Sequence, residues 1–218
     1  MKKICCIFGA GEYYGNEQLP QGEYSVITAD GGYLTAQKLG LTPEVHIGDF
    51  DSLSAEAHAA EVIRLKPEKD DTDTLSAVKL AMARGAETIL LYGCTGGRSD
   101  HMFSNIQTLS EIARRGCTAR MIGNREIFAC IHNDAIRFTA DSAGMISVFS
   151  LSDKSAGVRE TGLKYEIENY TMTNGFPIGT SNEFIGAAAE IGVADGTLLI
   201  IYTDQAKERS EFDAGRDF

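Results

Sequence analysis

The stretch Pro43–Asp51, P-E-V-H-I-G-D-F-D, decides how the first part of the chain is interpreted. Its apolar residues up to Ile47 predict a short buried strand, and Gly48 permits a turn before Asp49 and Asp51. Carboxylates two residues apart in an extended stretch point the same way, so both can face one cation. Such hard oxygen ligands suit Mg²⁺ or Mn²⁺. The alternative is a solvated acidic turn that caps the following helix.

Length and composition are those of a globular protein. The 218 residues, of which 43% are hydrophobic, fit one large domain or two small ones. No apolar run is long enough to span a bilayer or to form a signal peptide, so we expect no membrane partner. Five cysteines without a C-x-x-C pair favour reduced thiols in the cytoplasm. The net charge of -11 argues against a nucleic acid partner, because such binding depends on neutralising phosphates.

Acidic residues also follow or precede other predicted elements. Asp30 follows the apolar stretch 24–29 and is itself followed by Gly31 and Gly32, which admit close approach by a ligand. The sequence K-D-D-T-D-T at 69–74 precedes a helical pattern, and capping accounts for only one of its three acids. Ligands of open α/β sheets bind at the carboxyl ends of strands, so we expect these acids to share one edge with the Asp-x-Asp pair. A simple turn is the alternative for Asp30.

A glycine-rich stretch at 93–101, G-C-T-G-G-R-S-D-H, lies between a predicted strand and a predicted helix. The backbone N–H groups of Gly96 and Gly97 are placed to bind an anion at the helix N-terminus, and Arg98 adds a bidentate phosphate partner. Asp100 has two open interpretations, as a helix cap or as a ligand.

Two common nucleotide-binding motifs are absent from the sequence. Gly9, Gly11 and Gly15 are spaced one residue too far apart for the dinucleotide fingerprint. No G-x-x-x-x-G-K-[ST] motif occurs either, so the glycine-rich stretch is not a P-loop.

The pattern of the sequence changes at Gly123-Asn124. Before this point strands alternate with helices, which predicts a parallel, doubly wound sheet. After it come short β-rich runs, at 127–131, 136–139, 145–151, 165–167 and 197–202. These runs predict a β-sandwich or flattened barrel. The predicted fold class is α/β, with a Rossmann-like parallel-sheet domain over 1–124 followed by a β-sandwich domain over 125–218.

From the residues alone, the acidic loops and the glycine-rich stretch predict a Mg²⁺-dependent enzyme that acts on a nucleotide. The motifs D-G-G, P-E-V-H-I-G-D-F-D-S, K-D-D-T-D-T and G-G-R-S-D-H, in this order and spacing, resemble those of the thiamine pyrophosphokinase family. The stretches G-L-K-Y at 162–165 and G-T-S-N-E at 179–183 resemble the C-terminal vitamin-binding signatures of that family. The resemblance therefore covers most of the chain.

The resemblance implies a homodimer, with active sites between subunits, that transfers the pyrophosphoryl group of ATP to thiamine and releases AMP. It implies Mg²⁺ ligands at Asp49, Asp51 and Asp73. Nucleotide contacts are implied at Asp30, Gly31, Gly32, Asp71, Thr72, Gly96, Gly97 and Arg98. Thiamine contacts are implied at Ser181, Asn182 and Tyr165, the last of which stands where some family members have tryptophan. Either Asp73 or Asp100 is expected to accept the hydroxyl proton, and the sequence does not choose between them.

Two other functions fit parts of the sequence. Asp49-Phe50-Asp51 is also the D-x-D pattern of metal-dependent glycosyltransferases that use nucleotide sugars, but the separate glycine-rich stretch and the small β domain argue against this class. A non-catalytic nucleotide or vitamin sensor needs binding only, whereas the set of acidic residues is complete. Binding of a UDP-sugar tests the first alternative, and turnover of ATP to AMP tests the second.

Overall fold

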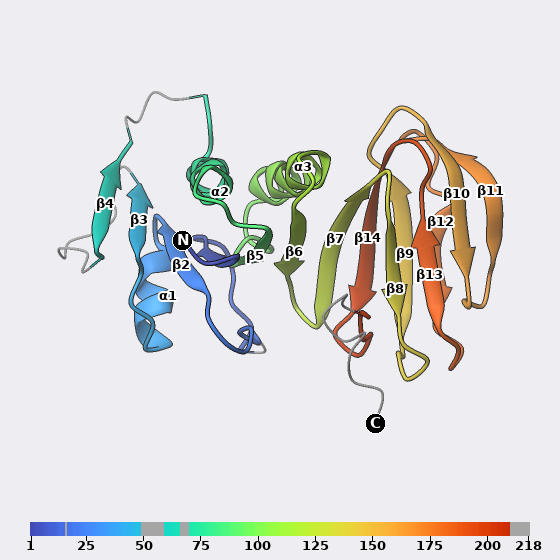
Figure 1. The fold of residues 1–218 in the computed structure, drawn as a ribbon, viewed down its shortest axis with the longest axis horizontal. Coiled ribbons are helices and arrows are strands. Elements are labelled where there is room, and N and C mark those ends of the chain that lie inside the picture. Colours follow the sequence, from blue (N-terminus) through green and yellow to red (C-terminus); the bar gives the residue numbers. More distant parts are fainter. Residues whose placement is uncertain (16, 49–58, 66–69, 210–218) are drawn as a thin grey trace. The chain divides into compact units, whose positions relative to one another are not determined.

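The structure is a computed structural model of the chain, and it describes residues 1–15, 17–48, 59–65 and 70–209. It has a mixed α/β fold with a large sheet and a second, antiparallel sheet of four strands (Figure 1). The chain divides into two compact units, Met1–Asn124 and Arg125–Phe218. Within the residues described, no helix is long and apolar enough to cross a membrane.

The described part of the first unit contains six strands and three helices. In chain order they are β1 (Ile4–Phe8), β2 (Ser25–Ala29), α1 (Gly32–Lys38), β3 (Val45–Gly48), β4 (Glu61–Arg64), α2 (Asp73–Ala83), β5 (Thr88–Tyr92), α3 (Ser99–Arg114) and β6 (Thr118–Ile122). The strands lie in the order β6-β5-β1-β2-β3-β4, and every neighbouring pair is parallel. The predicted parallel arrangement of this part is therefore confirmed.

The inner strands β1 and β2 are mostly apolar on both faces, unlike the edge strand β4, in which Glu61 and Arg64 are exposed. Every residue of β2 is buried, and in β1 only Ile4 is partly exposed. Such continuous apolar runs are typical of parallel strands covered on both sides. One face contributes Cys6, Phe8 and Val26 to a buried cluster that includes Ala36 of α1. Figure 1 shows α2 and α3 next to each other, away from α1, so helices cover the sheet on separate sides.

The helix starts in this unit bear on the predicted site. Thr72 is the N-cap of α2, and its side chain accepts a hydrogen bond from the N–H of Leu75. In α3 the N-cap position is occupied by Arg98 and the helix begins at Ser99. Asp100 lies in the first turn instead, which removes its interpretation as the N-cap.

The described part of the second unit contains eight strands. They are β7 (Glu126–His132), β8 (Ala135–Phe138), β9 (Met145–Ser150), β10 (Ser155–Thr161), β11 (Ile167–Met172), β12 (Gly179–Glu183), β13 (Ala189–Gly192) and β14 (Thr197–Thr203). One set follows the order β12-β9-β14-β7 and the other the order β11-β10-β13-β8, with antiparallel neighbours in both. A single buried cluster takes side chains from both sets, for example Ile146 and Ile200 from the first and Val158 and Ile191 from the second.

The sequence did not reveal every strand of this unit. The predicted strand at 165–167 is wrong, since β11 begins only at Ile167. Three further strands, β10, β12 and β13, were not predicted. The strand β12 reads G-T-S-N-E and has no large apolar residue, so its sequence lacks the alternation on which strand prediction depends.

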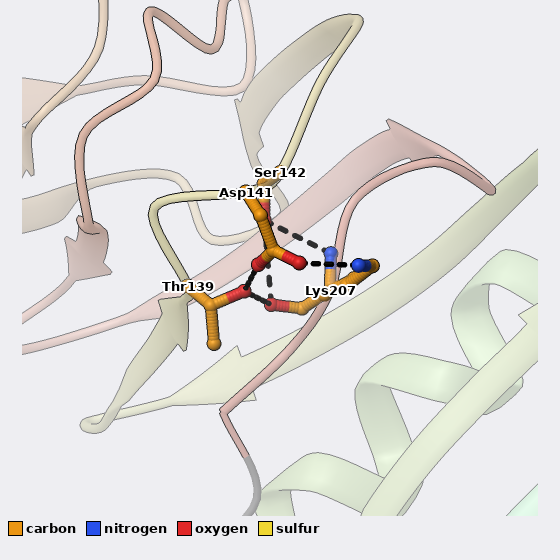
Figure 2. A network of polar contacts seen from close by, with 4 residues as sticks. All are labelled: Thr139, Asp141, Ser142 and Lys207. Carbon is orange, nitrogen blue, oxygen red and sulfur yellow. Dashed lines mark hydrogen bonds and ion pairs between the residues drawn. The ribbon is translucent and has the colours of Figure 1, made fainter.

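A network of polar contacts holds the segment that follows β14 against the turn between β8 and β9 (Figure 2). The carboxylate of Asp141 accepts a hydrogen bond from the hydroxyl of Thr139 and pairs with the ammonium group of Lys207. The backbone N–H of Lys207 donates to Ser142 Oγ at 2.9 Å. These bonds with Lys207 and Thr139 lower the pKa of Asp141.

Candidate active site

Asp30 lies at the edge of the first unit where β2, β3 and β5 have their carboxyl ends, because these strands are parallel. Its backbone is left-handed, with φ of 46°, and its N–H donates to the carbonyl oxygen of Ile47 at 2.9 Å. A Cβ atom at Gly48 would come within 2.6 Å of Asp30 Oδ1, so a side chain at this position would displace the carboxylate from where it lies. Asp30 is therefore held where β3 ends. Asp49 and Asp51 follow directly, but they lie outside the described residues.

Gly31 and Gly32 connect this carboxylate to α1. Gly31 is the N-cap of the helix, and Gly32 is its first residue. A Cβ atom at Gly32 would lie 2.0 Å from the carbonyl oxygen of Phe8, at the end of β1. Glycine is thus required at this position for packing, and a nucleotide contact through either glycine stays a prediction.

Some residues of the acidic stretch before α2 already have partners within the chain. Thr72 serves as the helix cap, and Asp73 is the first residue of α2, where a carboxylate interacts favourably with the helix dipole. The carboxylate of Asp71 pairs with the ammonium group of Lys79 at 2.6 Å. Because both members of this pair are partly exposed, the pair is weak and can exchange for another partner.

The glycine-rich turn between β5 and α3 contains three glycines with left-handed backbones. The φ angles of Gly93, Gly96 and Gly97 are 60°, 70° and 59°. Residues with a side chain rarely adopt this conformation. The turn leads directly into the N-terminus of α3, where backbone N–H groups can bind an anion.

Arg98 and Asp100 pair with each other at the start of α3. Arg98 Nε donates to Asp100 Oδ1 at 3.1 Å, and Nη2 donates to Oδ2 at 2.7 Å. The hydrogen bond from Arg98 lowers the pKa of Asp100 to about 2. Both side chains are exposed, so the pair is weak, and the guanidinium group can take a phosphate as its partner instead.

Glu12 is a part of this site that no motif of the sequence indicates. The N–H of Gly97 donates to Glu12 Oε1 at 3.0 Å. Backbone bonds fix the same segment, because Glu12 N donates to the carbonyl oxygen of Thr95 at 3.1 Å and Gly11 N to that of Gly93 at 2.7 Å. The Glu12 carboxylate therefore accepts a hydrogen bond from the Gly97 N–H, the group that we expect to bind phosphate.

Tyr13 covers the beginning of the glycine-rich turn. Its hydroxyl donates to the carbonyl oxygen of Gly9 at 2.7 Å, and burial raises its pKa. A Cβ atom at Gly93 would lie 2.3 Å from the tyrosine ring, and one at Gly11 would lie 2.6 Å from the carbonyl oxygen of Gly93. The pair Gly9-x-Gly11 was the available sequence signal, since glycines mark close backbone approach.

Asn105 supports the turn from within α3. Its buried amide donates to the carbonyl oxygen of Cys94 at 2.8 Å. Burial raises the pKa of Cys94 to about 12, so its thiol remains protonated at neutral pH. The buried amide of Asn105 therefore holds the turn at Cys94. Gly97 and Arg98, by contrast, donate to the exposed carboxylates of Glu12 and Asp100.

No cluster of three or more possible metal-ligating side chains occurs within the residues that the structure describes. Two of the three predicted Mg²⁺ ligands, Asp49 and Asp51, lie outside those residues. The metal site consequently stays a prediction. Two described carboxylates lie at element ends in this unit. Asp30 directly follows β2, and Asp73 is the first residue of α2.

The predicted thiamine contacts of the second unit differ in exposure. Tyr165 is 62% exposed, and the ammonium group of Lys164 lies 5.9 Å from the centroid of its ring. Lys164 also pairs with Glu183 at 2.8 Å. Ser181 is exposed, with a left-handed backbone of φ 64°, and its N–H donates to Ser147 Oγ at 3.0 Å.

Asn182 is buried, in contrast to Tyr165 and Ser181. Its side chain makes four hydrogen bonds to groups of the protein, two of them to the backbone of Tyr165. The structure thus brings Tyr165 and Asn182 together, as their joint assignment implies. A direct bond from Asn182 to a ligand stays a prediction.

Two family models match the chain. The model described as thiamin pyrophosphokinase, catalytic domain, matches residues 17–121, and the one described as thiamin pyrophosphokinase, vitamin B1 binding domain, matches residues 135–198. These matches separate at the same part of the chain as the two compact units.

Individual relatives agree with the family models. The thiamine pyrophosphokinase of Bacillus subtilis (strain 168) is 29% identical over 182 residues, which cover 80% of this chain and 85% of the relative. Its crystal structure has a TM-score of 0.81 at 26% identity, and covers 92% of this chain and 99% of that chain. The crystal structure of thiamin pyrophosphokinase from Geobacillus thermodenitrificans has a TM-score of 0.77 at 28% identity, and covers 92% and 97%.

Proposed function

Because the chain belongs to the thiamine pyrophosphokinase family, we propose that it transfers the pyrophosphoryl group of ATP to the hydroxyethyl oxygen of thiamine. The products are thiamine diphosphate and AMP. The observation that carries this proposal is the pair of family matches. One match spans the acidic and glycine-rich loops of the first unit, and the other spans Tyr165, Ser181 and Asn182.

The two units correspond to the two substrates in this proposal. The first is a Rossmann-like domain that binds ATP, and the six parallel strands with their ligand-binding edge support this assignment. The second is a β-sandwich that binds thiamine, which is supported by the buried cluster shared between its two sets of strands.

Phosphate binding requires an exchange of partners at the glycine-rich turn. The phosphates of ATP take the place of Asp100 at the guanidinium group of Arg98, and of Glu12 at the N–H of Gly97. The hydroxyl oxygen of thiamine then forms a bond to the β-phosphorus, while the bond from this phosphorus to the α,β-bridging oxygen breaks and AMP leaves. Arg98 and the backbone N–H groups stabilise the charge on the transferred group.

Mg²⁺ dependence is part of the proposal. Asp49, Asp51 and Asp73 would hold the ion, with Asp30 close to them, and carboxylate oxygens are the ligands that this ion prefers. The fit is supported by the position of Asp30, whose backbone N–H donates to the carbonyl oxygen of Ile47, two residues before Asp49. When bound, the ion supplies positive charge to the phosphate oxygens.

We propose that an aspartate at this edge, Asp73 or Asp100, accepts the hydroxyl proton. Arg98 lowers the pKa of Asp100 to about 2 in the free protein, but ATP releases Asp100 from this pair, so both carboxylates stay candidates. We expect the variant that removes the acceptor, Asp73→Asn or Asp100→Asn, to lower kcat by about 10²-fold or more. Near-normal kcat of both variants across the pH range would rule out this role.

A homodimer with active sites between subunits completes the proposal, as the resemblance of the sequence implies. Large apolar side chains of the second unit are exposed in the single chain, among them Tyr165, Phe176 and Ile185. Exposed apolar groups of this size are typical of interaction surfaces when they are contiguous. Sedimentation equilibrium tests this part, and a monomer at the concentrations used for turnover would contradict it.

A phosphorus NMR time course with Mg-ATP, with and without thiamine, tests the proposed reaction. We expect AMP and thiamine diphosphate to form together, and only when thiamine is present. Formation of ADP would show that the γ-phosphorus is attacked instead. Binding of both ligands without turnover would favour a sensor, and binding of a UDP-sugar would favour a glycosyltransferase.

A further inference from the structure

The side chain of Asn182 binds the backbone of Tyr165 as a neighbouring strand would. The N–H of Tyr165 donates to Asn182 Oδ1 at 3.0 Å, and Asn182 Nδ2 donates to the carbonyl oxygen of Tyr165 at 2.7 Å. The N–H of Glu183 also donates to Oδ1, at 2.9 Å, and Nδ2 also donates to Glu160 Oε2, at 2.9 Å. An asparagine side chain has two N–H donors and two acceptor sites on its oxygen, so its capacity is filled.

Glu160 anchors this amide from the opposite sheet of the second unit. It lies on β10, whereas Asn182 lies on β12, so their bond joins the two sets of strands. The Glu160 side chain is 1% exposed, and Oε1 has no hydrogen-bond partner within the described chain. Burial raises the pKa of this carboxyl group. A buried carboxyl with an unsatisfied oxygen disfavours folding, so its presence calls for a functional reason.

A β-bulge turns Asn182 into this position. The pairing of β12 with β9 changes register between Gly179 and Asn182. Ser181, inside this interval, has the left-handed backbone. Bulges re-aim side chains, and strained backbone conformations of residues other than glycine are concentrated at functional sites. As a result, Asn182 points into the protein while Ser181 is exposed.

We propose that Asn182 and Glu160 are positioning residues that hold the backbone of Tyr165, so that its exposed ring is preorganised to bind thiamine. This inference rests on the proposed function and on Tyr165 as the aromatic contact. Both the N–H and the carbonyl oxygen of Tyr165 are fixed by one buried amide, which leaves little freedom in its backbone. A rigid aromatic group loses less conformational entropy on binding than a mobile one.

This role makes a different prediction from direct recognition of thiamine by Asn182. The amide cannot donate to a ligand without losing a protein partner. If Asn182 contacted thiamine directly, loss of the Glu160 acceptor would free a donor for the ligand and would not weaken binding. If Asn182 acts through Tyr165, loss of that acceptor loosens the amide and weakens binding.

The chain contains no tryptophan, so Tyr165→Trp introduces a single fluorescent indole at the position in question. Quenching of this indole by thiamine measures binding without turnover, and its anisotropy measures how firmly the position is held. Glu160→Met removes the acceptor at similar side-chain volume, whereas Glu160→Gln retains an acceptor oxygen. Both Glu160 variants are made in the natural sequence, for kinetics, and in combination with Tyr165→Trp, for fluorescence.

Ser155→Ala is the matched control. Ser155 lies at the other end of β10, and its buried hydroxyl is 2.8 Å from that of Ser150 on β9. This bond also joins the two sets of strands, but it does not involve Tyr165. The control therefore separates general loosening of the second unit from a specific effect on the tyrosine.

We expect Glu160→Met to raise both the Kd and the KM for thiamine about fivefold, which is the effect of one lost hydrogen bond. The anisotropy of the indole should fall and the KM for ATP should not change. Tm should fall no further than in Ser155→Ala, because the hydrogen bond lost by Asn182 Nδ2 is offset by removal of a buried carboxyl group with an unsatisfied oxygen. Glu160→Gln should restore thiamine affinity to within about twofold. Ser155→Ala should lower Tm and leave the KM for thiamine unchanged.

Two outcomes would overturn this inference alone. One is a natural-sequence enzyme that converts thiamine while Glu160→Met leaves its KM for thiamine unchanged. The other is a Ser155→Ala variant whose KM rises as much as that of Glu160→Met. A natural-sequence protein that neither binds nor converts thiamine would overturn the proposed function, and this inference with it.

Discussion

Two loops of the molecule differ in how their polar groups are paired. The glycine-rich turn of the first unit uses exposed partners, whereas the segment 162–166 of the second unit, called the Tyr165 turn, is held by a buried amide. Arg98 has a side chain that is 72% exposed and pairs with an exposed carboxylate, Asp100. Asn182 is 5% exposed, and all its hydrogen bonds go to protein groups. Exposed ion pairs contribute little and exchange readily, whereas a satisfied buried amide is unfavourable to disturb. The first turn is thus suited to changing partners, and the second to keeping one geometry.

The largest effect is expected from Arg98→Ala, which removes the exchangeable cation of the first turn. We predict that kcat/KM for ATP falls about 10²–10³-fold, as when a charge-stabilising donor is lost at a reaction centre. The free energy of unfolding should change by less than about 0.5 kcal/mol, because the pair with Asp100 is exposed. Steady-state kinetics and urea unfolding measure the two quantities.

Arg115→Ala is the control for this variant, since Arg115 forms an exposed pair with Glu111 at the other end of α3. It should leave kcat/KM unchanged. If Arg98→Ala lost stability in proportion to activity, the turn would be structural and not an exchangeable site.

Asn182→Ala should show the reverse pattern, with a large effect on stability. Its removal leaves the backbone of Tyr165, the N–H of Glu183 and the carboxyl group of Glu160 without a partner. We predict a loss of about 2 kcal/mol or more in the free energy of unfolding, measured by urea denaturation. A change below about 0.5 kcal/mol would mean that the amide is not integral to the second unit.

The pH dependence of stability tests the burial of Glu160. Its folded-state pKa is raised above 4.5 by burial, so the folded protein holds the proton more tightly than the unfolded chain does. Below about pH 4.5 both states are protonated, and above it the natural protein loses stability as pH rises through the folded-state pKa. The stability of Glu160→Met relative to the natural sequence should therefore increase with pH across this window. A pH-independent difference would contradict the raised pKa.

The smallest effect concerns Glu12, the internal competitor for the Gly97 N–H. Glu12→Gln removes a negative charge but keeps an acceptor oxygen, so we predict that ATP binds about threefold more tightly in calorimetry. Glu23→Gln is the control, because Glu23 forms an exposed pair with Lys2 near the start of β2. Weaker ATP binding by Glu12→Gln would indicate that Glu12 assists the nucleotide instead of competing with it.

Much of the first unit was predictable because its signals are local. Continuous apolar runs such as Ile4–Phe8 and Thr88–Tyr92 indicated buried parallel strands, and the acidic stretch at 69–74 indicated the start of a helix. Glycines likewise indicated the turn at 93–97. These features depend on neighbours within a few residues, so the sequence contains them directly.

The remaining features depend on contacts that are distant in sequence. Glu12 meets Gly97 across 85 residues, and Asn182 meets Glu160 across 22. A contact between Asn182 and thiamine stays a prediction, whereas the bonds of its side chain to Tyr165 and Glu160 follow from the bulge between Gly179 and Asn182. Nothing local in G-T-S-N-E specifies that bulge, because the register of β12 is set by its pairing with β9.

The central claim is that the turn of the first unit acts on ATP and that of the second on thiamine. Steady-state KM values for both substrates, measured on Arg98→Lys and Glu160→Met, test it most directly. Lysine keeps the charge of Arg98 but not its bidentate geometry, so Arg98→Lys should raise the KM for ATP alone. Glu160→Met should raise the KM for thiamine alone. If either variant raised both KM values equally, the assignment of the two turns to separate substrates would be contradicted.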